Sequence, residues 1–530
     1  MPDTIADAPW WKKGVFYQVY PRSYMDKNGD GVGDIAGITD RLNYISDLGI
    51  DGIWISPCFE SPMKDFGYDV TDYRKIDPLF GTNEDFTALL NKAHSLDMKI
   101  IVDMVLSHTS DQHPWFKESR LGRENRKADW YVWADPKPDG SPPNNWQSIF
   151  GGPAWTYDTK RCQYYMHSFL KEQPDLNFHN DAVQKQMLSE CEYWLEMGID
   201  GFRFDTANHY FHDQDLRDNP PRDPESISTG LQLDTVIPYS MQKHVYDKSR
   251  PENMDFLKKI RALMDRYDGT MTLGEIGDDD PYKLAVEYTK GGERLHTAYN
   301  THLIAGTSAG NIAPETIRTP FEEFEKYPSD SWPSWAFTNH DVVRVATRWG
   351  KGIENKVDFA ALMNKLLLSL RGTPFLYQGD ELGLPEASIP YEQIQDPWGK
   401  FMWPEWQGRD GCRTPMPWNK EAAAAGFSAN TTDRQSPWLP IPTEHKKIAV
   451  NLQEKDERSV LRQTRDFIHW RKTQPLLQLG DIKFHETEND NIIAFDRYID
   501  DERMTCVFNI TEEAAVFNGE NYPPLSATFI

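Results

Sequence analysis

The chain has 530 residues, of which 39% are hydrophobic and 26% charged, and its formal net charge is −25. This length and apolar content exclude a disordered protein and allow a large core shared by more than one domain. The acidic excess argues against nucleic acids and anionic membranes as partners, because both require clustered positive charge. The composition favours solubility but names no substrate.

The cysteines and the N-terminal residues bear on the cellular compartment. There are five cysteines, an odd number, and none has C-x-x-C spacing, which argues against a disulfide framework and against a zinc site. Buried thiols in a reducing cytoplasm are the expected state. The first residues lack the layout of a secretion signal, and no uncharged apolar stretch approaches the roughly 20 residues that span a bilayer. We expect a soluble cytoplasmic protein, either a monomer or a homodimer.

Apolar runs of strand length recur along the chain and alternate with segments of helical periodicity. The predicted strands are Val15–Tyr20, Gly52–Ser56, Lys99–Leu106, Gly201–Asp205, Met271–Glu275, roughly His296–His302, Trp335–Thr338 and Pro374–Tyr377. The predicted helices are Ile38–Leu48, Asn83–Leu96, Asp181–Met197, Glu252–Arg266 and Lys356–Arg371. A doubly wound open sheet would share this local pattern, but eight repeats favour an α/β fold with a closed (β/α)8 barrel.

Two long segments interrupt the alternation, and its character changes near the end. About 70 residues, 107–177, separate the third strand from its helix and predict an inserted subdomain. A second insertion falls at about 207–250. The barrel domain is therefore expected at 1–106 and 178–460. From about residue 460 the pattern is one helix, Ser459–Thr473, followed by alternating strands, which predicts a small antiparallel β domain at 461–530.

The first strand is followed by a loop that is rich in oxygen ligands. Oxygen-bearing side chains alternate with glycines at the tight turn in residues 26–34, as at the start of an EF-hand loop. The twelfth position is Gly37, so the bidentate glutamate of an EF-hand is missing. The pattern fits a hard divalent cation, Ca²⁺ or Mg²⁺, whose predicted ligands are Asp26, Asn28, Asp30, Val32 and Asp34.

Three further carboxylates fall at the ends of buried strands: Asp205, Glu275 and Asp341. A parallel barrel builds its active site from the carboxyl ends of several strands, so these acids are expected to converge. Arg203 lies two residues before Asp205 and faces the same side, where it would keep that carboxylate ionised. One ionised and one protonated carboxyl group are the requirement of retaining glycoside hydrolysis. His108 and His340 belong to the same face.

These segments resemble the ordered strand-end motifs of glycoside hydrolase family 13, the α-amylase family. The stretch Gln173–Asn177 is similar to a motif of its α-glucosidase and oligo-1,6-glucosidase subgroup. The resemblance runs from about residue 10 to 460, and its other supporting stretches are Trp10–Arg22, Asp103–His108, Gln378–Gly383 and Gly411–Trp418. It implies a retaining glucosidase without an organic cofactor. Related enzymes carry a cation in the first strand–helix loop.

The resemblance also implies a role for each matching residue. Asp205 would be the nucleophile, Glu275 the acid/base and Asp341 the transition-state stabiliser. Arg203, His108 and His340 would line the same subsite. Asp65 would pair with Arg413 and wall off the non-reducing end, while Tyr68 would stack on the terminal glucose. A pocket closed in this way implies exo-action.

The linkage specificity depends on the residue after the nucleophile. In the subgroup a valine there accompanies α-1,6 preference, and threonine or alanine accompanies α-1,4 preference, so Thr206 favours α-1,4 bonds. We expect hydrolysis of maltose-like substrates or α-glucosides, with transfer to acceptor alcohols or sugars. The alternatives are an oligo-1,6-glucosidase and a sucrose or maltose isomerase. A non-catalytic transporter partner would lack the acids.

The acceptor side of the site departs from the family pattern. Many relatives have phenylalanine and an acid after the sixth strand, where this chain has Ala298–His302. The aromatic loop Trp398–Trp406 and Asp410 are expected to wall the acceptor side. If that wall excludes water but admits an alcohol, transfer would compete with hydrolysis.

Overall fold

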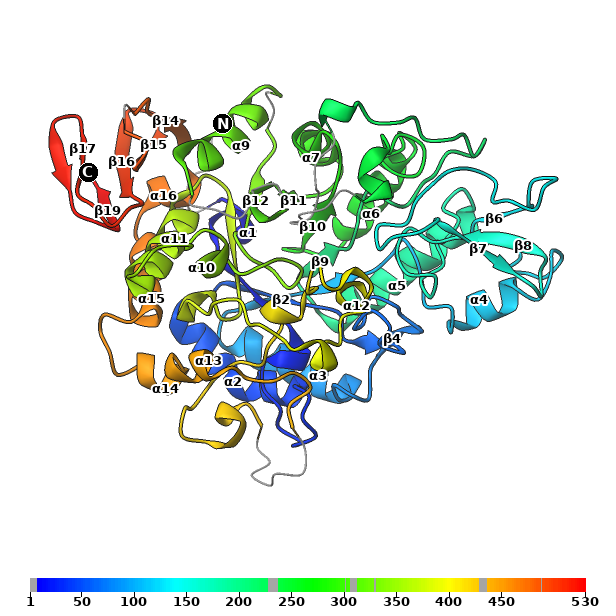
Figure 1. Ribbon diagram of the computed structural model, residues 1–530, viewed down its shortest axis with the longest axis horizontal. Helices are drawn as coiled ribbons and strands as arrows, with labels where there is room; N and C mark the ends of the chain where they lie inside the picture. Colours follow the sequence, from blue (N-terminus) through cyan, green and yellow to red (C-terminus); the bar gives the residue numbers. More distant parts are fainter. Residues whose placement is uncertain are drawn as a thin grey trace.

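The computed structural model describes residues 7–226, 237–300, 302–305, 312–327, 330–428, 436–487 and 489–530. Eight parallel strands close into a barrel, in which each strand pairs with the next along the chain and the last pairs with the first (Figure 1). The strands are β1 Phe16–Val19, β2 Gly52–Ile55, β5 Lys99–Met104, β9 Gly201–Phe204, β10 Met271–Ile276, β11 Thr297–Asn300, β12 Pro333–Trp335 and β13 Thr373–Tyr377. The predicted fold class is confirmed.

Helices surround the barrel, and all five that the periodicity predicts are present with ends that differ by at most three residues. The main ones are α2 Ile35–Leu48, α3 Asn83–Ser95, α5 Asp181–Met197, α6 Asn253–Met264, α7 Pro281–Thr289, α9 Pro314–Glu325 and α11 Lys356–Ser369. Local sequence fixes their ends. Asp34 caps α2 by accepting from the amide of Gly37, and Asn180 caps α5. Gly49 ends α2 with a φ of 92°, a left-handed conformation that costs glycine little.

The residues between β5 and α5 form an inserted subdomain. It contains the short helix α4 Pro114–Ser119 and a three-stranded antiparallel sheet in the order β6 (Trp133–Ala134), β8 (Gln163–Met166), β7 (Trp155–Asp158). Trp146 and Trp155 pack in its small core. A separate hairpin precedes it in the chain, made of β3 Phe59–Glu60 and β4 Asp72–Ile76.

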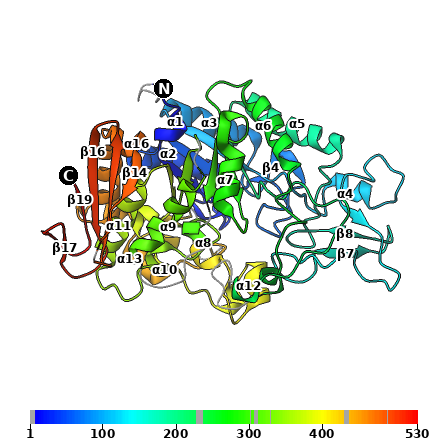
Figure 2. The ribbon, with the colours of Figure 1, turned by 90° about the horizontal axis from the view of Figure 1, so that it is seen from above.

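The C-terminal sheet lies at the end of the molecule opposite the inserted subdomain, as the two ribbon views agree (Figures 1 and 2). Its order is β14 (Asp481–Phe484), β15 (Ile492–Ile499), β16 (Glu502–Asn509), β19 (Ser526–Phe529), and all its pairs are antiparallel. The preceding helix α15, Val460–Arg471, packs on the barrel helices α11 and α2. The sheet therefore begins at Asp481, and α15 itself completes the barrel wall.

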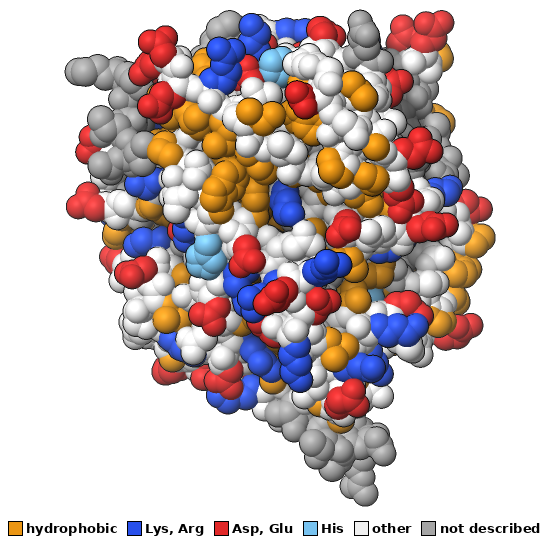
Figure 3. Space-filling model, turned by 90° about the vertical axis from the view of Figure 1, so that its left-hand side faces the viewer, with side chains coloured by type: hydrophobic (Ala, Val, Ile, Leu, Met, Phe, Trp, Pro, Cys, Tyr) orange, Lys and Arg blue, Asp and Glu red, His pale blue; other side chains and the backbone are white. Residues whose placement is uncertain are grey.

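The face around the C-terminal sheet carries apolar side chains in its upper part and interspersed acidic and basic ones below (Figure 3). Exposed apolar residues of the C-terminal part include Val516, Tyr498 and Ile530. Among the helices of the described residues, none is long and apolar enough to cross a membrane.

Candidate active site

One buried arginine holds the carboxylates at the strand ends together. Arg203 of β9 directs Nη1 to Asp205 Oδ1 at 2.7 Å and to Asp103 Oδ1 at 2.8 Å, and its Nη2 lies 2.6 Å from Glu275 Oε2. Asp205 follows β9 directly, Glu275 is part of β10, and the guanidinium lies between them. The expected pairing of Arg203 with Asp205 is thus present and extends to two further carboxylates.

The two carboxyl groups next to the cavity have different proton affinities. Burial raises the pKa of Asp205 to about 6, although Arg203 opposes the shift. Burial raises the pKa of Glu275 to about 7, and the neighbouring charges of Asp205 and Asp341 add to this rise, while Arg203 again opposes it. Near neutral pH, Asp205 is therefore the ionised member of the pair, and Glu275 is the one that can hold a proton.

Asp341, which follows β12, sits in a strongly basic environment. Its Oδ1 accepts from Arg413 Nη2 at 2.8 Å and from Arg409 Nη1 at 3.3 Å, and its Oδ2 lies 3.3 Å from His340 Nε2. Burial acts to raise the pKa of Asp341, but His340 and the two arginines outweigh it and lower that pKa below its ordinary value. Asp341 is consequently a fixed negative charge.

Thr206 connects the nucleophile candidate with Glu275. Its backbone amide donates to Glu275 Oε2 at 3.2 Å, and its hydroxyl lies 3.3 Å from Asp205 Oδ2 and 3.1 Å from Ser107 Oγ. Its φ is +40°, which is rare for a β-branched residue and costs conformational energy. The strained turn places the amide of Thr206 where it can donate to Glu275.

A buried ion pair lines the cavity at Asp65, but the prediction of its arginine was wrong. Asp65 Oδ1 pairs with Arg409 Nη2 at 2.8 Å, whereas Arg413 contacts Asp341 and the carbonyl of His340. Asp396 holds the guanidinium of Arg409 from the other side, with Oδ1 at 2.8 Å from Nη2. The two arginines are four residues apart on one loop, so the conformation of the loop decides which of them reaches Asp65.

Tyr68 and His108 line the cavity next to this ion pair, and His340 lies behind them. The Tyr68 hydroxyl lies 2.6 Å from His340 Nε2 and donates to Asp103 Oδ2 at 3.1 Å. Burial lowers the pKa of His340 to about 3 and that of His108 to about 4, so both imidazoles are neutral. Gln18 donates to His340 Nδ1, which leaves Nε2–H as the donor toward Tyr68.

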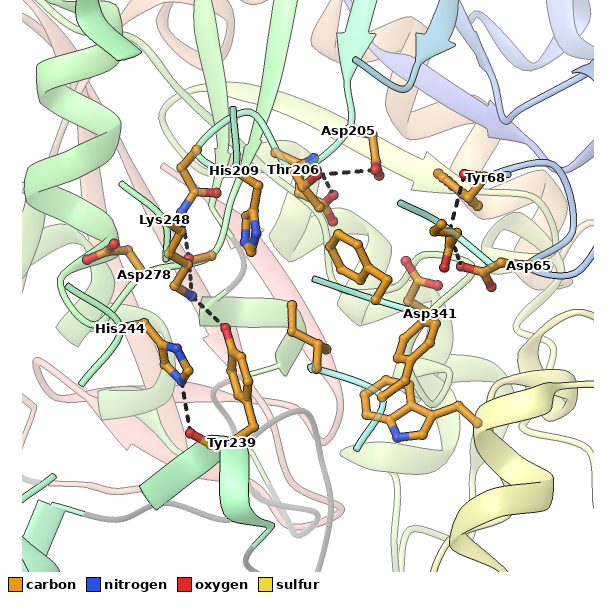
Figure 4. A pocket seen from close by; sticks show the side chains of 18 of the residues that line it. Asp65, Tyr68, Asp205, Thr206, His209, Tyr239, His244, Lys248, Asp278 and Asp341 are labelled. Carbon is orange, nitrogen blue, oxygen red and sulfur yellow. Dashed lines mark hydrogen bonds between the residues drawn. The ribbon is translucent and has the colours of Figure 1, made fainter. Parts of the chain in front are cut away.

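The side chains surround a cavity of about 330 Å³ at the carboxyl ends of the strands (Figure 4). Ten catalytic and substrate-binding residues are predicted from the sequence, and those that line the cavity are Asp65, Tyr68, His108, Asp205, Thr206, Glu275 and Asp341. Arg203, His340 and Arg413 are almost fully buried behind them. These three residues can influence a substrate only by positioning the residues that line the cavity.

The sequence interpretation missed other lining residues. Gln173 Nε2 donates to Asp65 Oδ2 at 3.2 Å, and its motif is visible in the sequence although no role follows from it. No motif in the sequence marks the other lining residues Arg409, Tyr239 and Lys248. The last two come from the insertion between β9 and α6, in which Pro238–Met241 forms a short 3-10 helix.

The residues expected to wall the acceptor side do not gather there: Trp398 lies next to Arg409. Trp398 lines the cavity, but Asp410 does not, because its Oδ2 accepts from the backbone amides of Gln395 and Asp396 and holds their loop. Of the unusual stretch after the sixth strand, Tyr299 is buried in the barrel. Thr301 lies outside the described residues.

The loop proposed to hold a cation is folded around its own carboxylates. Asp26, fully buried, accepts from the amides of Gly29 and Gly31, and Asp34 Oδ2 accepts from the amides of Lys27 and Asn28. Within the described part of the chain, no three Asp, Glu, His or Cys side chains are gathered closely enough to hold a metal ion. A cation here would depend on the amide oxygen of Asn28 and on backbone oxygen as well, and it stays a prediction.

Comparison with known proteins agrees with this geometry. The family described as alpha amylase, catalytic domain, matches residues 18–480. A probable alpha-glucosidase of Rhizobium meliloti (strain 1021) is 50% identical over 510 residues, covering 96% of this chain and 91% of that protein. An oligo-1,6-glucosidase of Heyndrickxia coagulans is 36% identical, covering 96% of this chain and 93% of that protein.

Solved structures show the same similarity in three dimensions. The crystal structure of an alpha-glucosyl transfer enzyme matches with a TM-score of 0.91 and 49% identity, covering 96% of this chain and 92% of that one. A trehalulose synthase of Pseudomonas mesoacidophila MX-45 matches with a TM-score of 0.85 and 32% identity over the same shares.

Proposed function

The chain belongs to the α-amylase family of glycoside hydrolases, and on this premise we propose that it is a retaining, exo-acting α-glucosidase that removes terminal α-1,4-linked glucose from short substrates. The observation that supports the proposal is the buried ion pair of Arg409 with Asp65 beside Tyr68 in the lining of the cavity, which would make that end of the cavity blind. A buried ion pair at this place leaves no passage for a chain that continues beyond the terminal sugar. The substrates would be maltose-like sugars or α-glucosides.

The mechanism follows from the charge states of the two acids. Asp205, ionised and oriented by Arg203, attacks the anomeric carbon and forms a covalent glucosyl ester, while Glu275 gives its proton to the departing oxygen. Glu275, now a carboxylate, takes a proton from water, which attacks the same carbon and releases glucose of retained configuration. Asp341 holds a negative charge beside the sugar hydroxyls and the positive charge that develops on the ring.

The proximity of the two carboxyl groups supports retention. Both contact the same guanidinium, Asp205 through Nη1 and Glu275 through Nη2, and both contact Thr206. An inverting enzyme separates its carboxyl groups further, by roughly 6.5–9.5 Å, to leave space for a water molecule. The preference for α-1,4 bonds rests on Thr206 alone. The alternatives are an oligo-1,6-glucosidase and a sucrose or maltose isomerase. Similar proteins named as an oligo-1,6-glucosidase and as a trehalulose synthase support testing both.

The test is product analysis with maltose, isomaltose and sucrose supplied separately. We expect glucose from maltose, released with the α configuration, and no activity in an Asp205→Asn variant. Turnover of isomaltose in preference to maltose would refute the α-1,4 assignment. Rearrangement of sucrose without release of free glucose would instead identify an isomerase.

Transfer and a structural cation complete the proposal. The glucosyl ester can be attacked by an alcohol or a sugar as well as by water, so transglucosylation would accompany hydrolysis. The loop 26–34 would hold one Ca²⁺ or Mg²⁺ ion remote from the reaction. Elemental analysis of the purified protein is expected to give about one divalent ion per chain, and chelation to lower the melting temperature. A metal-free protein with an unchanged melting temperature would contradict the cation.

A further inference from the structure

The cavity continues past the carboxylates to a wall that the reaction scheme does not use. Tyr239, His244 and Lys248 line it on one side of the pocket, and Asp65 and Tyr68 lie on the opposite side, with Asp205 and Thr206 between the two groups (Figure 4). Because the side of Asp65 is closed by Arg409, the side of Lys248 is where the leaving group must lie.

Lys248 is an unusual member of this wall, because its ammonium is buried and forms no ion pair with any residue that the structure describes. Its Nζ donates to the Tyr239 hydroxyl at 3.0 Å and to the carbonyl of Gly277 at 2.9 Å. An ammonium group has three N–H donors, and among the described residues the structure gives it no third hydrogen-bond partner and no carboxylate within salt-bridge distance. Only 7% of the residue is exposed, and it lines the cavity.

The surroundings keep this lysine charged and in place. Burial disfavours the charge, but Tyr239 and Asp278 outweigh it and raise the pKa of Lys248. The other cation of this wall, Arg222, is neutralised by an ion pair with Asp279. Among the described residues of this wall, Lys248 is therefore a cation that is held by neighbouring charges but has no carboxylate in direct contact.

The Tyr239 ring is equally well fixed. It stacks on the His244 ring with centroids 3.7 Å apart at 21°, and His244 in turn bonds Asp247 Oδ2 at 2.7 Å and the Tyr239 carbonyl at 2.9 Å. One face of the tyrosine is covered by His244, and the residue lines the cavity. A flat apolar surface next to a single polar donor is a combination that recognises a sugar ring with its hydroxyls.

We propose that Lys248 is the polar anchor of the leaving-group side. Its third N–H donates to a hydroxyl of the sugar that departs with the cleaved bond, or of the sugar that accepts the glucosyl group, and the Tyr239 ring supports the apolar face of that sugar. The inference rests on the proposed glucosidase function and deepens it: the leaving group and the acceptor are hydroxyl-bearing sugars, and Lys248 selects them.

The test compares two donors that differ only in the leaving group, maltose and α-glucosyl fluoride. Lys248→Met should lower kcat/KM for maltose by about tenfold or more, as expected for a lost hydrogen bond from a charged donor. It should change kcat/KM for the fluoride less than about threefold. With the fluoride as donor and glucose as acceptor, the ratio of transfer to hydrolysis should fall by a similar factor of about ten.

Matched variants separate recognition from structure. Lys365 is a half-buried lysine of α11 that donates to Gln463 at 2.9 Å, and Lys365→Met should leave both donors unaffected. Lys248→Gln keeps a donor and should recover part of the maltose activity, while Tyr239→Phe keeps the ring and should lose an intermediate factor. If Lys248→Met does not fold, these two variants carry the same comparison.

Two results would overturn the inference. An equal loss on maltose and fluoride in a folded Lys248→Met protein would mean that Lys248 only holds the Gly277 loop next to Glu275. No loss on either donor would mean that no leaving group is bound there. Both results leave the glucosidase intact, whereas a wild-type protein that cleaves neither donor would refute the proposed function itself.

Discussion

Arg203 gives the two carboxylates a common counter-charge, and burial is the largest cause of the rise in both pKa values. Burial raises the pKa of Glu275 to about 7, and Asp205 and Asp341 add to this rise. Burial raises the pKa of Asp205 to about 6, where Asp103 and Asp341 add to the rise and a hydrogen bond from Arg203 opposes it. The proposed mechanism requires Asp205 without its proton and Glu275 with its proton. Below the lower value Asp205 becomes protonated, and above the higher value Glu275 loses its proton, so the active form is most abundant between them.

The pH dependence should therefore be a narrow bell. We expect kcat/KM for maltose to fall on the acid side near pH 6 and on the alkaline side near pH 7, as apparent values of the coupled pair. For α-glucosyl fluoride the alkaline fall should be absent, because fluoride departs without a proton from Glu275. An identical alkaline fall for both donors would contradict the assignment of Glu275.

Lysine substitutions at Arg409 and Arg413 test the role of the ion pair with Asp65. Arg409→Lys keeps the charge but cannot contact Asp65, Asp396 and Asp341 together, so kcat/KM for maltose should fall at least about tenfold. Since the wall against longer chains would loosen, a glucoside extended at its non-reducing end should lose less than maltose does. Arg413→Lys, which leaves the Asp65 pair intact, provides the control. Equal effects on both substrates in Arg409→Lys would contradict the role of the wall.

At the scale of the elements, β10 shows how a strand positions a side chain. Gly274 precedes Glu275, and a Cβ at this position would lie 2.4 Å from Leu295 Cδ1. The strand can approach Leu295, itself fully buried, only because residue 274 has no side chain. The position of Glu275 thus depends on the packing behind it.

Gly274→Ala is the corresponding prediction. We expect a loss of about 1–3 kcal/mol in the free energy of unfolding from overpacking, together with reduced kcat as Glu275 shifts. In a Leu295→Ala background the same substitution should cost less, because the colliding methyl group is gone. Chemical denaturation and kinetics of the four proteins measure this coupling. Purely additive losses would show that the contact is not responsible.

The same scale explains what the sequence does and does not predict. Most of the strands are predictable because they are buried and read as apolar runs. The seventh prediction was wrong in position: β12 spans Pro333–Trp335 instead of Trp335–Thr338, so Asp341 lies in the loop that follows the strand. Asp205, Glu275 and Asp341 nevertheless line one cavity. The partner of Asp65 is not predictable, because Arg409 and Arg413 lie on one irregular loop without a period. The proposed role of Lys248 is not predictable from the sequence either, because it depends on a contact with Gly277, which follows a different strand.

At the scale of the whole molecule, the net charge of −25 opposes compaction. The surface view shows charges of both signs interspersed on one face, so part of this repulsion is compensated locally (Figure 3). The remaining repulsion acts over longer distances and is screened by salt, with a screening length of about 10 Å at 0.1 M ionic strength.

The melting temperature should therefore rise with ionic strength, by a few degrees between about 0.01 and 0.5 M salt. Scanning calorimetry with NaCl and with choline chloride distinguishes general screening, which both salts provide, from binding of one cation. A melting temperature that falls with both salts would mean that surface ion pairs outweigh the repulsion.

The blind end next to Asp65 has a consequence for the order of events. A molecule that occupies the closed part of the pocket can leave only through the entrance used by its successor. For the proposed exo-acting enzyme, the aglycone would depart before glucose, and a new acceptor would enter while glucose is still attached to Asp205. Turnover is then a ping-pong sequence in which free glucose competes with the incoming substrate, so the enzyme slows as its own product accumulates.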